Sequence, residues 1–516
     1  MPQKGFYKRQ VPAVLGGALL ALSFPKFDLY PLAWFALFPF LVSLYGKPVG
    51  AAFRSGLLMG VVYFFGTQYW IYHSMHYYGG MGFVPSFFVV LLLSLYMSLY
   101  TAAFSALFAM KIKTTRLPAM VLSPLFWVSL EFARSYALTG FPWSSIGYSQ
   151  YKFLHAIQFA DITGIYGVSF LVLAVNGALA DIFIMKKREQ EMPLYTPYGT
   201  VLGYVALALA FFGIVGYGYL RLEETRAGSP LKVSVVQGSI EQDVKWDPAY
   251  QGEVLRIYNG LTASASMERP ALIVWPETAI PFYWERDRAL TESLIEFQRK
   301  LDAHLLFGAI TVKEETPQGI RLANSAVLLD REGRVSYKYD KIHLVPFGEY
   351  VPLRRLLFFV DRLAVGIGDY APGESYLKAE TPFGSFGTMI CYEIIFPGLV
   401  RKFYSKSGGG GDFIVTITND AWFGTTNGPY QHWSMAVFRA IENRKPVIRA
   451  ANTGISGFID SSGRVLAKTG LFERRVLTSE IRTDRTGTFY SRYGDLFSYI
   501  VIILSLLVLM ELKERE

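Results

Sequence analysis

Cysteine and charge are both scarce in this chain of 516 residues. The single cysteine, Cys391, excludes any disulfide within the chain. Charged residues make up only 18% of the sequence and hydrophobic residues 52%, a balance that excludes an intrinsically disordered chain. The composition therefore indicates a folded protein with many more apolar residues than a soluble domain usually has.

Positive charge is concentrated in the first part of the chain. Residues 1–220 contain 14 Lys and Arg against 6 Asp and Glu, and they account for most of the formal net charge of +9. The remaining 296 residues are nearly neutral, with 36 basic and 35 acidic residues. Because the basic part is also the apolar part, the excess does not have the pattern of a nucleic-acid-binding surface, and we expect no nucleic-acid partner.

Long uncharged runs predict transmembrane helices, since about 20 apolar residues in a helix cross the roughly 30 Å core of a bilayer. The first run follows basic residues as a signal peptide would, but no small-residue cleavage site follows it, which favours an uncleaved helix. We predict eight spans, seven of them N-terminal and one C-terminal, at about 11–25, 29–46, 55–72, 83–110, 117–130, 162–180, 197–220 and 496–510.

The basic residues between these spans predict the topology. If the N-terminus is cytoplasmic, 11 basic residues lie on the inner side and only 3 on the outer side, as the positive-inside rule requires. Both termini are then cytoplasmic, and in a bacterium with two membranes the large hydrophilic block lies in the periplasm. The predicted domains are a transmembrane domain over 1–220, a catalytic domain over 221–491, and a C-terminal helix with a cytoplasmic tail over 492–516.

The block from 221 to 491 alternates strand-like and helix-like segments. Continuous apolar runs predict strands that begin near 231, 271, 304, 324, 386 and 412, and amphipathic stretches predict helices over 249–267, 289–301 and 430–445. This alternation is typical of an α/β layered fold, and about 270 residues suffice for one large core.

Three of the strand-end segments contain residues suited to cysteine chemistry: Glu277 in WPET, Lys341 in YDKIHL and Cys391 in MICYE. Taken singly, each has an ordinary structural explanation, because a lone cysteine in an apolar strand is usually a buried small hydrophobe. In an open sheet, however, loops at the carboxyl ends of strands meet in one crevice. Glu277 would serve there as the base, and Lys341 as the cation, that a thiolate nucleophile needs.

Two further residues in these segments were considered. The backbone N–H of Tyr392, directly after the cysteine, could stabilise an oxyanion together with the lysine ammonium. His343 is the only histidine in the three segments, and we interpret it as a structural hydrogen-bonding residue.

His73 and His76 have a metal-like spacing, but no third ligand is nearby, which favours an interfacial aromatic belt. We therefore expect no metal and no organic cofactor.

The residues Glu277, Lys341 and Cys391 in these settings resemble the Glu-Lys-Cys triad of the nitrilase superfamily, which implies an αββα sandwich for the catalytic domain. The segments NDAWFG at 419–424 and RAIENRKPVIRAANTG at 439–454 look like further parts of that pattern. The string HLVPFGEYVP, the loop FPWSSIGYSQ and the seven-plus-one helices narrow the resemblance to the apolipoprotein N-acyltransferase family. It covers essentially the whole chain.

This resemblance implies a function. An acyl chain, typically from phosphatidylethanolamine, would pass through a cysteine thioester to the amine of a diacylglyceryl-modified apolipoprotein at the bacterial inner membrane. Cys391 would be the nucleophile, Glu277 the general base and Lys341 the oxyanion stabiliser, in an enzyme that we expect to be a monomer. The supporting or substrate-binding positions implied by the family pattern are Glu349, Tyr392, Glu393 and Trp246.

Alternatives remain at two points. The apolar stretch 351–368, with three interspersed arginines, fits either a lid that dips into the lipid or an amphipathic helix packed on the sheet. The triad alone does not distinguish acyl transfer to an amine from hydrolysis by a membrane-tethered amidase or nitrilase. A membrane transporter is disfavoured, because the predicted spans contain few ionisable residues.

Overall fold

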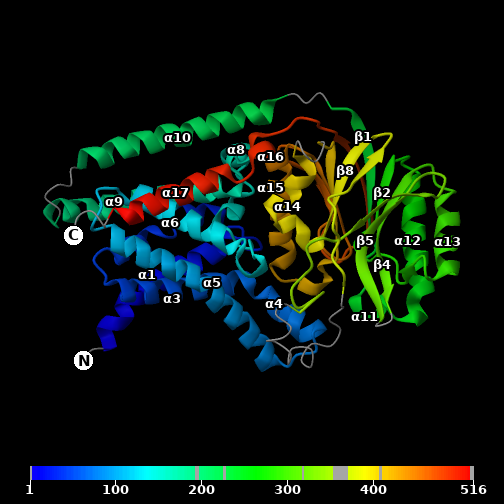
Figure 1. Cartoon of the computed structure of the whole chain (residues 1–516), viewed down its shortest axis with the longest axis horizontal. Helices are drawn as coiled ribbons and strands as arrows, with labels where there is room; N and C mark the ends of the chain where they lie inside the picture. The colour runs from blue at the N-terminus through cyan, green and yellow to red at the C-terminus, as the bar shows by residue number, and fades with distance from the viewer. Residues whose placement is uncertain are drawn as a thin grey trace. The chain divides into compact units, whose positions relative to one another are not determined.

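The computed structural model describes residues 3–191, 197–224, 228–316, 319–351, 370–405 and 410–511. The chain divides into two compact units (Figure 1). The first unit comprises residues 1–72, 83–224 and 493–516, and the second comprises residues 73–82 and 225–492. Each unit is described separately below.

The first unit consists of helices. Four of them are long and apolar enough to cross a membrane, namely Val49–Gln68, Phe83–Lys111, Ile165–Glu191 and Tyr198–Glu223. The main helices are α1 (Gln3–Ser23), α3 (Val49–Gln68), α5 (Phe83–Lys111), α6 (Ala119–Arg134), α9 (Ile165–Glu191), α10 (Pro197–Glu223) and α17 (Leu496–Met510). Shorter elements are η1 (Tyr30–Trp34), α2 (Phe38–Leu44), α4 (Trp70–His73), η3 (Ala137–Thr139), η4 (Ile146–Gln150), α7 (Leu154–Ile157) and α8 (Ala160–Thr163).

Small residues allow α3 and α5 to pack closely. A Cβ atom on Gly60 would lie 2.1 Å from the Thr101 hydroxyl oxygen, and one on Gly56 would lie 2.3 Å from that of Ser105. The Thr101 hydroxyl donates a hydrogen bond to the Gly56 carbonyl at 3.0 Å. Close contact through glycine, serine and threonine is the usual way in which helices associate where no water drives them together.

The predicted span over 29–46 is not one continuous helix. Prolines occupy the first turns of both η1 and α2, and the chain between these two elements is not helical. Proline supplies no amide hydrogen and its ring clashes with the preceding turn, so it favours the first turn of a new helix over the interior of a continuous one. Asn176 of α9 accepts hydrogen bonds from the backbone N–H groups of Leu37 and Phe38 at this break. The number of membrane crossings stays a prediction.

The second unit is a two-sheet sandwich. One sheet has the strand order β13-β1-β2-β4-β5-β6, with β3 paired to β4, and the other has the order β12-β11-β10-β9-β8-β7. The strands of the first sheet are β1 (Pro230–Gln237), β2 (Leu272–Val274), β3 (Tyr283–Trp284), β4 (His304–Thr316), β5 (Gly319–Leu329), β6 (Val335–Asp340) and β13 (Arg475–Arg482). Those of the second are β7 (Lys378–Thr381), β8 (Gly384–Ile390), β9 (Phe413–Thr418), β10 (Val447–Ala451), β11 (Gly457–Ile459) and β12 (Val465–Lys468).

Helices cover the outer faces of the two sheets (Figure 1). Helices α12 and α13 lie on one side of the sandwich, and α14 and α15 lie on the other. This arrangement is the αββα architecture implied by the resemblance, and the predicted strands and helices are present close to their expected positions. The helical elements are η2 (Ser74–Tyr78), α11 (Gln242–Lys245), η5 (Pro248–Tyr250), α12 (Gln251–Ser266), α13 (Arg288–Gln298), η7 (Cys391–Ile395), α14 (Pro397–Tyr404), η9 (Asp420–Phe423), α15 (Gly428–Asn443) and α16 (Phe489–Tyr493).

Residues 73–82 cluster with the second unit, although they lie between two apolar helices in the sequence. The Ser74 hydroxyl donates to the Trp422 carbonyl at 2.7 Å, and the Tyr78 ring lies edge-on to the Trp422 ring at 5.2 Å. Ser74 and Tyr78 of this segment therefore pack on Trp422, a contact that the sequence did not predict. Residues 352–369 lie outside the described residues, so both alternatives for 351–368 stay open.

Candidate active site

The site is built where buried strands end. Glu277 lies three residues after β2, Lys341 directly after β6, and Cys391 directly after β8. Asn419 directly follows β9, which pairs in parallel with β8. Parallel neighbours end at the same edge of a sheet, and this brings residues distant in sequence into one crevice.

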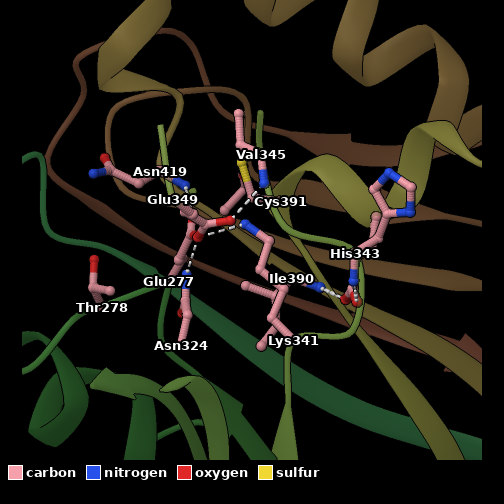
Figure 2. Close-up of polar contacts among 12 residues, drawn as sticks. Glu277, Thr278, Asn324, Lys341, His343, Val345, Glu349, Ile390, Cys391 and Asn419 are labelled. Atoms are coloured by element: carbon pink, nitrogen blue, oxygen red, sulfur yellow. Dashed lines mark hydrogen bonds and ion pairs between the residues drawn. The ribbon is translucent and has the colours of Figure 1, made fainter. Parts of the chain in front are cut away.

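Lys341 is held between two carboxylates. Its ammonium lies 2.9 Å from Glu349 Oε1 and 3.5 Å from Glu277 Oε1, and its side chain is only 1% exposed. Figure 2 shows these three side chains pointing toward one another, with Cys391 beside them. Burial alone lowers the pKa of Lys341, but the Glu349 and Glu277 carboxylates outweigh that effect, and the pKa is raised. The lysine is therefore a fixed cation.

Backbone and amide donors hold the Glu277 carboxylate. Asn324 Nδ2 donates to Glu277 Oε1 at 2.8 Å and to Glu349 Oε1 at 3.0 Å, so one amide joins both acids. The backbone N–H of Asn419 donates to Glu277 Oε2 at 2.8 Å. Because hydrogen bonds to a charged acceptor are stronger than neutral ones, these donors fix the orientation of the carboxylate. The sequence analysis did not identify Asn324, which lies inside a strand with no recognisable motif.

Cys391 is buried, with 8% of its surface exposed, and its backbone has a left-handed φ of 51°. A non-glycine residue in this conformation is strained, and such strain persists only where the surroundings enforce it. Burial raises the pKa of the Cys391 thiol, the Glu277 charge raises it further, and the Lys341 charge lowers it. The resting sulfur is therefore a thiol, which must lose its proton to a base as it attacks.

Glu349 positions the lysine from the far side of the site. Besides its ion pair with Lys341, its Oε2 accepts a hydrogen bond from the backbone N–H of Val345 at 2.8 Å. The ion pair and this hydrogen bond together close the segment from Lys341 to Glu349 into a compact loop. The geometry agrees with a supporting role for Glu349, which orients the Lys341 ammonium.

Glu393 joins the lysine segment to the cysteine segment. Its Oε1 accepts hydrogen bonds from the Tyr339 hydroxyl at 2.7 Å and from the backbone N–H groups of Ile342 and His343 at 2.8 and 3.2 Å. Its Oε2 accepts one from the backbone N–H of Ile390 at 2.8 Å. Burial raises the pKa of Glu393 to about 7, despite these donors. This residue is thus a structural link between Lys341 and Cys391.

Trp246, which the resemblance implies to be a supporting or substrate-binding residue, is partly exposed, whereas the residue before it is buried. Trp246 is 37% exposed, and its ring lies 6.4 Å from the ring of Tyr283. The preceding residue, Lys245, is fully buried and donates to the Glu277 carbonyl at 3.1 Å and to the Thr278 hydroxyl at 2.7 Å. Burial lowers the pKa of Lys245 to about 8. The sequence analysis missed Lys245, although it supports the turn that carries Glu277.

Aromatic rings near Lys341 and Cys391 pack on one another. The His343 ring lies 3.9 Å from the Phe396 ring and 5.7 Å from the Tyr392 ring. Burial and the Lys341 charge lower the pKa of His343 to about 4, so the imidazole is neutral near pH 7. A neutral ring packed on aromatic rings agrees with the structural interpretation of His343.

The assembled groups can perform nucleophilic acyl transfer. Glu277 offers a carboxylate base, Lys341 a fixed cation, and Cys391 a buried thiol, and these are the parts that a thioester mechanism requires. Among the described residues, no group of three or more His, Cys, Asp or Glu side chains is arranged to hold a metal ion. The expectation of a site without metal or cofactor stays a prediction.

Comparisons with known proteins match both units. Residues 16–178 match the family model of the apolipoprotein N-acyltransferase N-terminal domain, and residues 232–490 match that of the carbon-nitrogen hydrolases. An apolipoprotein N-acyltransferase of Geobacter metallireducens is 41% identical over 491 residues, which cover 95% of this chain and 92% of that protein. One of Haemophilus ducreyi is 32% identical over 489 residues, with 94% and 92% covered.

One solved structure also resembles part of the chain. It is a Saccharomyces cerevisiae member of branch 10 of the nitrilase superfamily, with 19% sequence identity and a TM-score of 0.38. The match covers 50% of this chain and 93% of the yeast protein.

Proposed function

Since this chain belongs to the apolipoprotein N-acyltransferase family, we propose that it transfers an acyl chain from a phospholipid to the N-terminal amine of a diacylglyceryl-modified apolipoprotein. The observation that carries this proposal is the convergence of Glu277, Lys341 and Cys391. Phosphatidylethanolamine is the proposed donor and a monomer the proposed working form. The product is a lipoprotein with three acyl chains.

The first half of the reaction forms a thioester. The Cys391 thiol gives its proton to Glu277 as the sulfur attacks the ester carbonyl of the phospholipid. Negative charge then develops on the carbonyl oxygen, where the Lys341 ammonium and the Tyr392 backbone N–H stabilise it. When the tetrahedral intermediate collapses, the carbon–oxygen ester bond breaks and the leaving glyceryl oxygen takes the proton from Glu277. A lysophospholipid leaves and the acyl chain stays on sulfur.

The second half transfers the acyl chain to nitrogen. The amine of the lipidated cysteine attacks the thioester carbonyl and loses a proton to Glu277, which is again a free carboxylate. The carbon–sulfur bond breaks, and the Cys391 thiolate recovers a proton from Glu277. The same two oxyanion donors serve both steps, because the charge develops at the same carbonyl oxygen.

Two arrangements within the site support these roles. Lys341 is paired to Glu349 at 2.9 Å, so its position does not depend on Glu277 alone. Glu277 is oriented by Asn324 and by the backbone N–H of Asn419 before it accepts the proton. A base that alternates between two protonation states needs such independent supports, because preorganisation supplies much of the rate.

The proposal extends to the setting in the membrane. We infer that the second unit lies on the outer face of the bacterial inner membrane and that both termini are cytoplasmic. The 11 to 3 distribution of basic residues between loops supports this orientation, and the apolar helices of the first unit support membrane insertion. Both substrates are lipid-anchored, so a catalytic unit tethered at the lipid surface meets them without extracting them from the bilayer.

Transfer and hydrolysis can be distinguished with purified protein in detergent. The protein is incubated with phosphatidylethanolamine and a synthetic diacylglyceryl peptide, and N-acylated peptide and free fatty acid are both quantified by mass spectrometry. We expect stoichiometric N-acylated peptide and little free acid. Free acid released at the same rate with and without peptide would instead identify a hydrolase.

Matched variants test the residue assignments. Cys391→Ser and Lys341→Ala should each abolish formation of the N-acylated peptide. Lys402→Ala is the control for the lysine, since Lys402 is exposed in the same unit and contacts Tyr376. Product formed by Cys391→Ser at the wild-type rate would contradict the proposal.

A further inference from the structure

Three buried polar side chains form a connected group next to Cys391. Asp420 follows β9, His432 lies in α15 and Arg449 lies in β10, and each is at most 1% exposed. Arg449 Nη2 donates to Asp420 Oδ2 at 2.8 Å. The His432 Nδ1 atom lies 3.0 Å from Asp420 Oδ1 and 3.0 Å from Arg449 Nη2. Buried charges are costly unless they are paired, and here the Asp420 carboxylate is paired with the Arg449 guanidinium.

This group contacts the backbone of the nucleophile, Cys391. The Nε2 atom of His432 lies 3.2 Å from the carbonyl oxygen of Cys391. The contact is made to the peptide group rather than to the thiol, so His432 is not a base for the sulfur. It holds the main chain at the residue whose φ of 51° is strained.

The surroundings of the ring determine which nitrogen carries hydrogen. A carbonyl oxygen can only accept, so His432 Nε2 must donate to Cys391. Nε2 therefore carries a hydrogen. Burial and the Arg449 charge lower the pKa of His432, although the Asp420 charge raises it. Nδ1 lies 3.0 Å from both Asp420 Oδ1 and Arg449 Nη2, and these two contacts hold the ring in place.

The bond to the Cys391 carbonyl also sets the direction of the next N–H. In a trans peptide, the carbonyl of Cys391 and the N–H of Tyr392 belong to one rigid plane and point to opposite sides. Tyr392 is the second residue of η7, where an N–H has no acceptor within the helix. Fixing the carbonyl therefore aims this N–H away from His432. A hydrogen bond to the carbonyl also polarises the peptide and makes its N–H a better donor.

The far end of the group is fixed by close packing. A Cβ atom on Gly454 would lie 2.2 Å from Asp420 Oδ2, so the backbone of residue 454 directly borders the carboxylate. The Thr418 hydroxyl donates to Asp420 Oδ1 at 2.9 Å. Asp420 can therefore move little, and Arg449 and His432 are held in turn. The position of the Cys391 carbonyl is thus determined by buried residues of η9, α15 and β10.

We propose that His432, held by Asp420 and Arg449, is a positioning residue that anchors the Cys391 carbonyl and thereby aims the Tyr392 N–H at the oxyanion of the acyl-transfer reaction. This inference rests on the proposed function, because the oxyanion forms only when the sulfur attacks a carbonyl. It assigns a role to a histidine that lies 41 residues from the cysteine in sequence. No proton transfer is assigned to the ring.

Two reactions of the same thiol test this role. Thioester formation from phosphatidylethanolamine passes through an oxyanion, whereas alkylation by iodoacetamide displaces iodide at a saturated carbon and forms none. His432→Asn shortens the side chain and His432→Met removes the N–H, so neither donates to the Cys391 carbonyl. His432→Gln keeps an amide N–H near the position of Nε2. Ser434→Ala, a change at a buried residue of the same helix, is the control.

We expect His432→Asn and His432→Met to slow thioester formation about 100-fold, the usual effect of losing one oxyanion donor, with KM for phospholipid unchanged. Alkylation of Cys391 should stay within about threefold of wild type, and His432→Gln should recover thioester formation to within about tenfold. Equal losses in both reactions, or full activity in a folded donor-free variant, would overturn the inference. If wild type is alkylated but forms no thioester, the proposed function itself fails.

Discussion

At the scale of single residues, the Glu277 carboxylate is oriented by the Asn324 side chain and by the backbone N–H of Asn419. Asn324 is the one side-chain amide that contacts both Glu277 and Glu349 among the described residues, at 2.8 and 3.0 Å. It also keeps the two acids apart without adding charge. Its carboxamide therefore allows two carboxylates to share one lysine.

Replacement of Asn324 should separate these two effects. Asn324→Ala loses hydrogen bonds to charged groups, worth about 1.5–3 kcal/mol, and should slow thioester formation about 10- to 100-fold. Asn324→Asp is nearly isosteric but places a third carboxylate beside the other two, and should slow the reaction about tenfold further. The measurement is the single-turnover rate of acylation of Cys391. An Asn324→Asp variant faster than Asn324→Ala would contradict the assigned arrangement.

Glu393 predicts a pH dependence that does not come from the catalytic base. Four donors point at its two oxygens, and this arrangement requires the carboxylate. Burial raises its pKa to about 7, so the carboxylate form is lost as the pH falls through about 7. On protonation, one oxygen becomes a donor that faces another donor, and the link between the Lys341 and Cys391 segments weakens.

The acylation rate should therefore fall as the pH drops from about 8 to about 6, with a midpoint near 7. Glu393→Gln should be slower than wild type at pH 8, because its amide nitrogen faces a donor at every pH. The acylation rate of Glu393→Gln should no longer change with pH near 7. A wild-type limb that persists unchanged in Glu393→Gln would assign the titration to another group.

At the scale of elements, strand β4 approaches the turn that carries Glu277 unusually closely. A Cβ atom on Gly308 would lie 2.4 Å from the Thr278 nitrogen and 2.6 Å from the Glu277 Cα atom. Both neighbours are backbone atoms, which cannot move aside as a side-chain tip can. Glycine at 308 is therefore required for the turn to lie against the strand.

Gly308→Ala should destabilise the second unit by about 1–3 kcal/mol and displace Glu277, with a loss of activity of about 100-fold. Gly260→Ala is the matched control, because Gly260 is exposed within α12 and has no atom within 4 Å of the added Cβ. That change should raise stability by about 0.5–1 kcal/mol. Thermal unfolding in detergent gives both values, and similar effects for the two variants would contradict the close approach.

The elements differ in how far the sequence predicts them. The strands before Glu277 and Cys391 are continuous apolar runs, so their ends and the chemistry at those ends were predictable. Asn324 and Lys245 were not, because each acts through partners distant in the chain. His432 lies in an amphipathic helix, where periodicity indicates burial but not the atom that the ring contacts. The break between η1 and α2 was not predicted, because the sequence there is one apolar run. Its prolines were the signal that could have indicated the break.

At the scale of the whole molecule, the scarcity of charge and the position of the basic residues have one explanation. The apolar helices of the first unit leave little room for charge, and most of the basic residues there lie between the predicted spans. The nearly neutral remainder of the chain, residues 221–516, contains the triad. This division predicts a sidedness that can be measured, because the chain has a single cysteine and that cysteine is buried.

New cysteines in a Cys391→Ala background report that sidedness. Lys113 and Glu473 are both exposed, the first in a predicted cytoplasmic loop and the second in the catalytic unit. In intact spheroplasts, a membrane-impermeant maleimide should label Glu473→Cys and leave Lys113→Cys unlabelled until the membrane is permeabilised. The opposite pattern would invert the predicted topology.

The central claim is that Cys391 carries the acyl chain between two substrates. Its most direct test is the intact mass of the purified protein after incubation with phosphatidylethanolamine and no acceptor. The account predicts a mass increase of one acyl chain, located on Cys391, which disappears when a diacylglyceryl peptide is added and never forms in Cys391→Ser. N-acylated peptide produced without any adduct on Cys391, or by Cys391→Ser, would contradict it.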